Sequence, residues 1–178
     1  MKKILFISFL MFCFAFNSNA QDTKSLPTQY QEAMKKILSN VPSVASSSAS
    51  QVLDFAKSLI GVPYRYATSN PDKGFDCSGF VNYVFSNFGF KVPRSSPEFA
   101  KTGTPVKLAD AKVGDVLIFT GSNPKQRRIG HVGIIYSIED DGKINFIHSS
   151  SGKANGVTIT PLNDYYKSRF MKAVSIVE

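Results

Sequence analysis

The chain has no tryptophan, two cysteines and two histidines in 178 residues, and each scarcity excludes a class of protein. Two cysteines are too few for a fold held together by several disulfides, and so few cysteines and histidines exclude most multi-ligand metal sites. We therefore expect no metal and no organic cofactor. Charged residues make up 19% and hydrophobic residues 43% of the chain, which argues against disorder and against a coiled coil. The 15 phenylalanines and 7 tyrosines are enough for the core of one domain.

The first twenty residues have the pattern of a secretory signal peptide. A positive start precedes an apolar run over residues 4–16, and small side chains end the segment at Ala20. The run is shorter than the roughly twenty residues that a bilayer-spanning helix needs. We predict cleavage before Gln21 and export to a periplasm or out of the cell. The alternatives are a retained membrane anchor and a lipoprotein attached through Cys13.

Removal of residues 1–20 changes both the charge and the thiol count. The formal charge falls from +8 to +6 over 158 residues, and Cys77 becomes the only cysteine. The surplus of lysine and arginine favours anionic partners such as nucleic acid, lipid head groups or acidic wall polymers, without choosing among them. A lone cysteine in an exported protein pairs with another chain, is buried and inert, or reacts.

The chain after the signal divides into a linker and one domain. Residues 21–50 are polar and rich in serine and threonine, which predicts a linker with a possible short helix. From there to residue 178 we expect a single domain. Its first helix is predicted over residues 51–60, with Ser50 as N-cap and Gly61 as the residue that ends it.

A second helix and a series of strands complete the predicted domain. Apolar residues at helical spacing predict a helix over residues 78–88. Five short β-rich runs separated by turn residues follow it, at 115–119, 132–138, 143–149, 157–160 and 171–177. Helices followed by consecutive strands predict an α+β fold with an antiparallel sheet.

Cys77 lies immediately before the second predicted helix, between Asp76 and Ser78. A thiol at a helix N-terminus is close to unpaired N–H groups and to the positive end of the helix dipole, which lower its pKa and favour the thiolate. The alternative is an inert buried cysteine. The polar neighbours favour a functional thiol.

The two histidines, His131 and His148, lie in two apolar strands. Taken singly, a histidine in such a strand is more often a packing residue with a satisfied hydrogen bond. Together with Cys77, however, the pair supplies the three parts of an activated thiol: a nucleophile, a base and a residue that orients the base. We therefore predict that the three side chains meet.

The hairpin between the two strands constrains how the histidines can meet. They are 17 positions apart, so an even-length loop in a regular hairpin puts them on the same face of the sheet. A strict two-residue turn at Asp141 and Gly142 would pair His148 with Ile135, about 13 Å along the strand from His131. Contact between the rings therefore requires another register or a bulge.

Several motifs occur in an order and spacing that resemble one known family. They are Gly61-Val62-Pro63-Tyr64, Phe75-Asp76-Cys77-Ser78-Gly79-Phe80, Val92-Pro93-Arg94-Ser95-Ser96, Val113-Gly114-Asp115-Val116, Gly130-His131-Val132-Gly133-Ile134-Ile135-Tyr136 and Phe146-Ile147-His148-Ser149. Residues 51–177 resemble the NlpC-type cysteine peptidases, which are papain-like bacterial cell-wall hydrolases. The resemblance implies a papain-like fold, with the nucleophile helix packed on the sheet. It also implies cleavage of peptidoglycan stem peptides, usually between γ-D-glutamate and a diamino acid, in the wall or in released muropeptides.

Carried over by position, the resemblance makes Cys77 the nucleophile, His131 the general base and His148 the residue that orients the base. The reaction passes through a thioester acyl-enzyme. It also places a tyrosine of the family at Tyr64, where the hydroxyl could help to bind the oxyanion.

The resemblance gives Asp76 and Ser78 contacts with the substrate, and capping of the helix is the alternative role for both. The chain departs from the family at residues 66–68, where Tyr-Ala-Thr replaces the frequent Trp-Gly-Gly, so the wall of the substrate site is expected to differ. Basic residues at 125–128 could attract the carboxylates of a stem peptide, or could form a solvated loop.

Two other functions remain open from the sequence. A papain-like amidase or acyltransferase would use the same thiol on another substrate. A non-catalytic module would bind wall or membrane, but such a module would be expected to have lost Cys77, His131 or His148. We expect a monomer without stable membrane insertion and without a nucleic-acid partner, since no basic stripe interleaved with aromatics occurs.

Overall fold

The computed structural model describes residues 44–177, so the predicted signal peptide and the linker up to residue 43 lie outside the described residues. The elements, in chain order, are α2 (Val44–Ser58), β1 (Ser69–Asn70), β2 (Gly74–Phe75), α3 (Cys77–Ser86), α4 (Ser96–Phe99), β3 (Thr104–Val106), a 3-10 helix η1 (Leu108–Asp110), β4 (Val116–Thr120), β5 (Ile129–Ile138), β6 (Ile144–Ser150), β7 (Gly156–Pro161), α5 (Asp164–Arg169) and β8 (Phe170–Ser175). No helix within residues 44–177 is long and apolar enough to span a bilayer.

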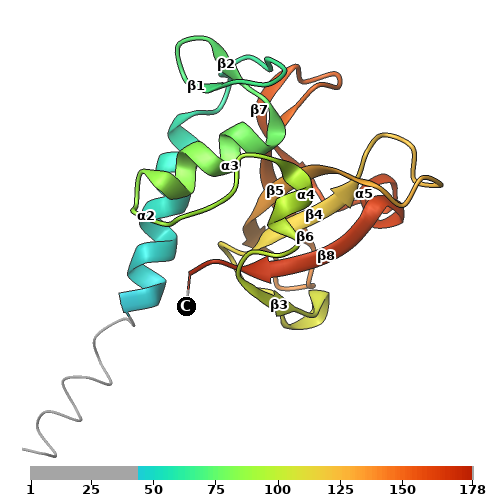
Figure 1. The fold of residues 1–178 in the computed structure, drawn as a ribbon. Helices are drawn as coiled ribbons and strands as arrows, with labels where there is room; N and C mark the ends of the chain where they lie inside the picture. Colours follow the sequence, from blue (N-terminus) through green and yellow to red (C-terminus); the bar gives the residue numbers. More distant parts are fainter. Residues whose placement is uncertain (1–43, 178) are drawn as a thin grey trace, which may run out of the picture. The chain divides into compact units, whose positions relative to one another are not determined.

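The strands form a six-stranded antiparallel sheet in the order β3-β8-β4-β5-β6-β7. Helices α2 and α3 lie together beside this sheet, and α3 packs against β5 and β6 (Figure 1). The predicted α+β class is confirmed, and the five predicted strand runs correspond to β4, β5, β6, β7 and β8. The short edge strand β3 was not predicted, because it holds three residues and one of them is Pro105.

The first helix begins earlier than the sequence predicts. Helix α2 starts at Val44, so Ser50 lies inside it and the prediction of Ser50 as N-cap is wrong. Residues 44–49 include no glycine or proline that would end a helix. The helix also ends earlier than predicted, at Ser58, and residues 59–61 form a turn in which Gly61 has a φ of 89° that few other residues adopt.

The sheet is buried on both faces, which explains why β4 has no exposed residue. Val116 and Ile118 pack with the helices in one core, and Leu117 and Phe119 pack in a second core on the opposite face. Tyr166 of α5 packs against the second core. Phenylalanines supply much of the volume of both cores, as the composition suggested.

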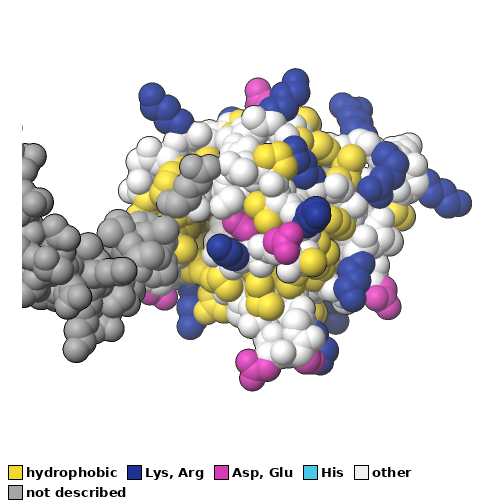
Figure 2. Space-filling model, turned by 90° about the horizontal axis from the view of Figure 1, so that it is seen from below, with side chains coloured by type: hydrophobic (Ala, Val, Ile, Leu, Met, Phe, Trp, Pro, Cys, Tyr) yellow, Lys and Arg dark blue, Asp and Glu magenta, His cyan; other side chains and the backbone are white. Residues whose placement is uncertain are grey.

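The charged side chains are dispersed on the face of the domain seen from below. Figure 2 shows lysine and arginine side chains spread over this face, with aspartate and glutamate between them. The positive charge of this face is therefore not gathered into a single patch within the part of the chain that the structure describes.

Candidate active site

Cys77 is the first residue of α3, and the local sequence fixes its position. The carboxylate of Asp76 caps the helix by accepting the N–H of Gly79 at 2.7 Å. Gly79 is required because a Cβ there would lie 2.1 Å from the carbonyl oxygen of Thr68. The buried thiol of Cys77 lies 3.9 Å from the carbonyl oxygen of Gly130, so α3 brings it to the start of β5.

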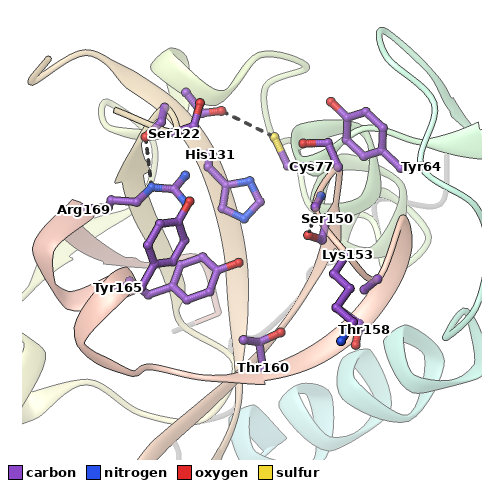
Figure 3. A pocket seen from close by; sticks show the side chains of 16 residues that line it. Tyr64, Cys77, Ser122, His131, Ser150, Lys153, Thr158, Thr160, Tyr165 and Arg169 are labelled. Carbon is purple, nitrogen blue, oxygen red and sulfur yellow. Dashed lines mark hydrogen bonds between the residues drawn. The ribbon is translucent and has the colours of Figure 1, made fainter. Parts of the chain in front are cut away.

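The two predicted histidines are in direct contact. Nε2 of His131 lies 2.8 Å from Nδ1 of His148, with the rings nearly perpendicular. His148 is fully buried, whereas His131 is partly exposed in the wall of a cavity that Cys77 also lines. The structure thus places Cys77 and His131 in the wall of one cavity, as Figure 3 shows, and His148 in contact with His131.

A bulge in β5 gives the hairpin the register that this contact requires. The pairs Ser137–Asn145 and Ile138–Ile144 are followed, after a shift, by Ile135–Phe146. The turn has three residues instead of two, because the N–H of Glu139 bonds to the carbonyl of Lys143. The three turn residues and the one extra residue at the bulge make an even number, so His131 and His148 lie on the same face of the sheet.

The resulting register places Gly133 across from His148. This placement follows from the pairing of Ile134 with Ile147. His131 is two residues from Gly133 on the same face of the sheet, so it lies diagonally across from His148. A Cβ on Gly133 would lie 3.0 Å from the Cβ of His148 and 2.6 Å from a ring carbon of Phe146. Glycine at 133 therefore leaves the space in which the imidazoles meet.

The outer nitrogen of His148 has a partner that the sequence did not indicate. Its Nε2 lies 3.0 Å from the hydroxyl oxygen of Thr160 on β7. When that nitrogen donates to Thr160, Nδ1 of His148 accepts from Nε2–H of His131, and Nδ1 of His131 is free to act as a base. A threonine in a strand has no motif that marks it, so only the pairing of β6 with β7 identifies Thr160.

Burial governs the protonation of the histidine pair. Aromatic rings of Phe119, Phe146 and Tyr166 surround it. Burial lowers the pKa of His148 to about 3, and burial, with smaller contributions from His148 and Arg169, lowers the pKa of His131 well below its ordinary value. Both imidazoles are therefore neutral at neutral pH.

The thiol differs from the sequence-based expectation in one respect. Burial raises the pKa of Cys77, and the opposing effect of nearby backbone N–H groups is smaller. The prediction that the helix N-terminus lowers this pKa is wrong for the free protein, because desolvation of the thiolate outweighs the dipole. The free site thus holds a neutral thiol beside a neutral imidazole.

We expect the protein to lose stability as the pH falls below about 6.5. His148 is protonated near pH 6.5 in an unfolded chain but only near pH 3 in the folded protein. Protons therefore bind the unfolded state first, and the free energy of unfolding decreases through this window by up to about 1.4 kcal/mol per pH unit for this one group. Urea unfolding between pH 7.5 and pH 4.5 measures the slope. His148→Asn should flatten it, and equal slopes for the two proteins would contradict the assignment.

Asp76 and Ser78 form a polar cluster with Arg94 beside the thiol. Arg94 donates to both carboxylate oxygens of Asp76, at 2.9 and 2.7 Å, and to the hydroxyl of Ser78 at 3.2 Å. The hydroxyl of Ser78 donates to Asp76 at 3.1 Å. The capping role considered for Asp76 is present in the structure. These residues also line a cavity of about 440 Å³ on one side of Cys77.

Tyr64 and Cys77 line both this cavity and a larger one of about 1050 Å³. Burial, followed by the nearby Cys77, raises the pKa of Tyr64, so its hydroxyl keeps its proton at neutral pH. In Figure 3, Tyr64 and Cys77 lie on one side of the larger cavity, Arg169 and Tyr165 on the other, and the ring of His131 between them.

The basic loop at 125–128 does not line either cavity. Arg127 instead donates to the carbonyl oxygens of Ser168 and Phe170, which ties the loop to the start of β8. Within residues 44–177, no group of three or more histidine, cysteine, aspartate or glutamate side chains could hold a metal ion.

Comparison with known proteins gives consistent matches for this domain. The profile of the NlpC/P60 family matches residues 61–175. The chain is 41% identical over 120 residues to the gamma-DL-glutamyl hydrolase of Bacillus subtilis, covering 66% of this chain and 27% of that protein. It is 32% identical over 154 residues to the murein DD-endopeptidase MepS/murein LD-carboxypeptidase of Escherichia coli, covering 85% of this chain and 72% of that protein. The chain thus spans only about a quarter of the length of its Bacillus relative.

Solved structures give the same result. A NlpC/P60 family protein from Bacillus cereus aligns with a TM-score of 0.63 and 28% identity, covering 73% of this chain and 40% of that one. The peptidoglycan hydrolase RipB from Mycobacterium tuberculosis aligns with a TM-score of 0.59 and 26% identity, covering 84% and 78%. The fold of residues 44–177 is therefore the one that these proteins share.

Proposed function

The chain belongs to the NlpC/P60 family, and on this premise we propose that it is a cysteine endopeptidase that hydrolyses the stem peptides of peptidoglycan. The observation that carries the proposal is the hydrogen-bonded pair of His131 and His148, of which His131 lines the cavity that is also lined by Cys77, the one thiol among the described residues. The bond between γ-D-glutamate and a diamino acid is the proposed target, and the matched Bacillus relative is named as a gamma-DL-glutamyl hydrolase. Export through the predicted signal peptide would bring the enzyme to this substrate.

In the proposed mechanism, neutral His131 takes the proton of Cys77 as the sulfur attacks the scissile carbonyl. The tetrahedral oxyanion accepts from the backbone N–H of Cys77, with the protonated hydroxyl of Tyr64 as a second donor. The imidazolium of His131 then protonates the leaving amine, and a thioester remains on Cys77. Water, deprotonated by His131, hydrolyses the thioester and restores the thiol.

His148 and Thr160 act by positioning His131. Because burial keeps His148 neutral, its Nδ1 can accept from Nε2–H of His131 and stabilise the imidazolium that forms during the reaction. The hydroxyl of Thr160 holds His148 in the tautomer that does this. The role resembles that of the third member of a catalytic triad.

We expect Thr160→Val to lower kcat about 10-fold with little change in KM. The valine keeps the shape of the side chain but leaves Nε2 of His148 without an acceptor, which favours the tautomer that blocks His131 as a base. Thr160→Ser should restore most of the activity, since it returns the hydroxyl. Steady-state kinetics on a stem peptide measure both variants, and a wild-type kcat for Thr160→Val would contradict the role of Thr160 in positioning His148 and His131.

The proposed function is tested with residues 21–178 and the Cys77→Ala variant on defined muropeptides, with the products read by mass spectrometry. A new diamino-acid N-terminus released by the wild-type protein alone would support the endopeptidase and identify the bond. Failure to cleave, with rapid alkylation of Cys77 at neutral pH, would indicate an amidase or acyltransferase on another substrate. Failure to cleave with an unreactive thiol would indicate a binding module.

A further inference from the structure

Arg169, the last residue of α5, is buried in the wall of the larger cavity with only 6% of its surface exposed. Its Nε donates to the carbonyl oxygen of Gly121 and its Nη2 to that of Thr120, both at 2.9 Å. The guanidinium carbon also lies 4.9 Å from the ring centre of Tyr165 and 5.3 Å from that of Tyr166. The side chain is thus fixed in one orientation by two carbonyls and two rings.

No carboxylate compensates this charge within residues 44–177. The ion pairs found there join Arg94 to Asp76 and Lys143 to Asp141. The residues that line the larger cavity include Lys153 and no aspartate or glutamate. A buried cation is costly unless an anion pairs with it, so this cavity favours a negatively charged group.

One nitrogen of Arg169 is available for such a group. The hydrogen bonds to protein use Nε and Nη2, and Nη1 has no acceptor among the described residues. No buried side-chain nitrogen or oxygen in the same part of the chain lacks a partner, so Nη1 is not sealed inside the protein. The guanidinium lies across the cavity from Cys77, beyond the ring of His131 (Figure 3).

The proposed reaction determines whether the acyl half or the leaving half of the substrate enters the larger cavity. His131 protonates the leaving amine, so the leaving half lies on the His131 side of Cys77. The larger cavity contains both His131 and Arg169, whereas the cavity beside Asp76 contains neither. The acyl half therefore occupies the smaller cavity and the leaving half the larger one.

We propose that Arg169 binds a free carboxylate of the leaving half of the substrate and so selects stem peptides that carry one. This inference rests on the proposed function. The carboxylate is either the C-terminal group of a short stem or the side-chain carboxyl of the diamino acid. The site thereby favours stems in which this group is free over stems in which it is amidated or linked.

The test compares peptides that differ only in this group. Wild-type protein is given a stem peptide with both carboxylates free, one with the C-terminus amidated, and one with the diamino-acid side chain amidated. One of the amides should lower kcat/KM by roughly 10- to 100-fold, as expected for loss of a hydrogen bond to a charged group, and that amide identifies the carboxylate bound. Equal cleavage of all three peptides would overturn the inference and leave the proposed function intact.

Variants assign the effect to Arg169. Arg169→Gln should reduce the acid-to-amide ratio to near one, mainly through KM, and Arg169→Lys should keep part of it. Lys167→Gln removes a charge from the same helix outside the larger cavity and should keep the full ratio. Thermal unfolding of each variant separates loss of recognition from loss of fold. A full ratio in a folded Arg169→Gln would overturn the inference.

A binding measurement decides the inference even if no peptide is cleaved. The isolated leaving half, as free acid and as amide, is titrated into the Cys77→Ala protein by calorimetry. Tighter binding of the acid, lost in the Cys77→Ala, Arg169→Gln double variant, supports the carboxylate site. Equal binding of acid and amide, or no binding of either at millimolar concentration, overturns it. Failure of cleavage alone counts against the proposed function only.

Discussion

Cys77→Ala is expected to lower kcat/KM for a stem peptide by roughly 10⁴-fold or more, and His131→Ala by a similar factor. The thiol is the only one among the described residues, so no neighbouring sulfur can replace it. His131 is equally irreplaceable: the other histidine of the site, His148, is fully buried behind it. The measurement is steady-state cleavage followed by mass spectrometry.

The double variant Cys77→Ala, His131→Ala makes this prediction more specific. Residues that act as one unit are strongly non-additive, so the double variant should be about as slow as either single variant. Near-ultraviolet circular dichroism provides the control that the fold is intact. Independent, multiplying losses would contradict a thiol activated by His131, and so would a His131→Ala protein with nearly wild-type turnover.

Asp76→Ala is expected to lower the free energy of unfolding by about 2–3 kcal/mol, the largest change in stability that we predict for a single side chain. The substitution removes an N-cap, worth about 1 kcal/mol. It also leaves Arg94 without its ion-pair partner, a loss of several kcal/mol when both groups are fully buried. The side chain of Arg94 is 40% exposed against 10% for Asp76, so solvent reduces this second part.

Two further variants separate the contributions of Asp76. Asp76→Asn keeps a good N-cap and loses the ion pair, and Arg94→Gln loses the ion pair and keeps the cap. Each should cost about half as much as Asp76→Ala in urea unfolding. Because Asp76 starts the helix that carries Cys77, Asp76→Ala should also slow the alkylation of Cys77 and the cleavage of a stem peptide. Unchanged stability of Asp76→Ala would show that neither contact matters to the fold.

The sequence was sufficient to predict the residues of the candidate site that local patterns mark. Cys77 stands between polar residues before an apolar helical stripe, and both histidines occur in short β-rich runs joined by an Asp-Gly turn. The pattern put the two histidines on one face only for an even-length loop and left their contact open. In the structure the rings touch, and the bulge in β5 provides the register for it. Helix and strand periodicity thus identified the class of the fold as well.

The features that the sequence did not reveal depend on tertiary contacts. The bulge in β5 is set by how β5 pairs with β6, and no residue type near Tyr136 signals it. Thr160 matters because it contacts His148, and Arg169 matters because it lines the larger cavity. In the sequence, neither residue belongs to a motif that would mark it. The direction of the pKa shift of Cys77 depends on its burial in the folded domain, which the flanking residues do not reveal.

The sequence distances within the site imply an order of assembly during folding. The two histidines are 17 positions apart on one hairpin, whereas the contact of Cys77 with Gly130 spans 53 positions. Closing the longer loop costs more chain entropy, and it requires α3 to dock on the finished sheet. We therefore expect the imidazole pair to form before the thiol joins it. A chain in which α3 has not docked on β5 lacks the contact between Cys77 and Gly130, so the proposed hydrolysis depends on the completion of folding.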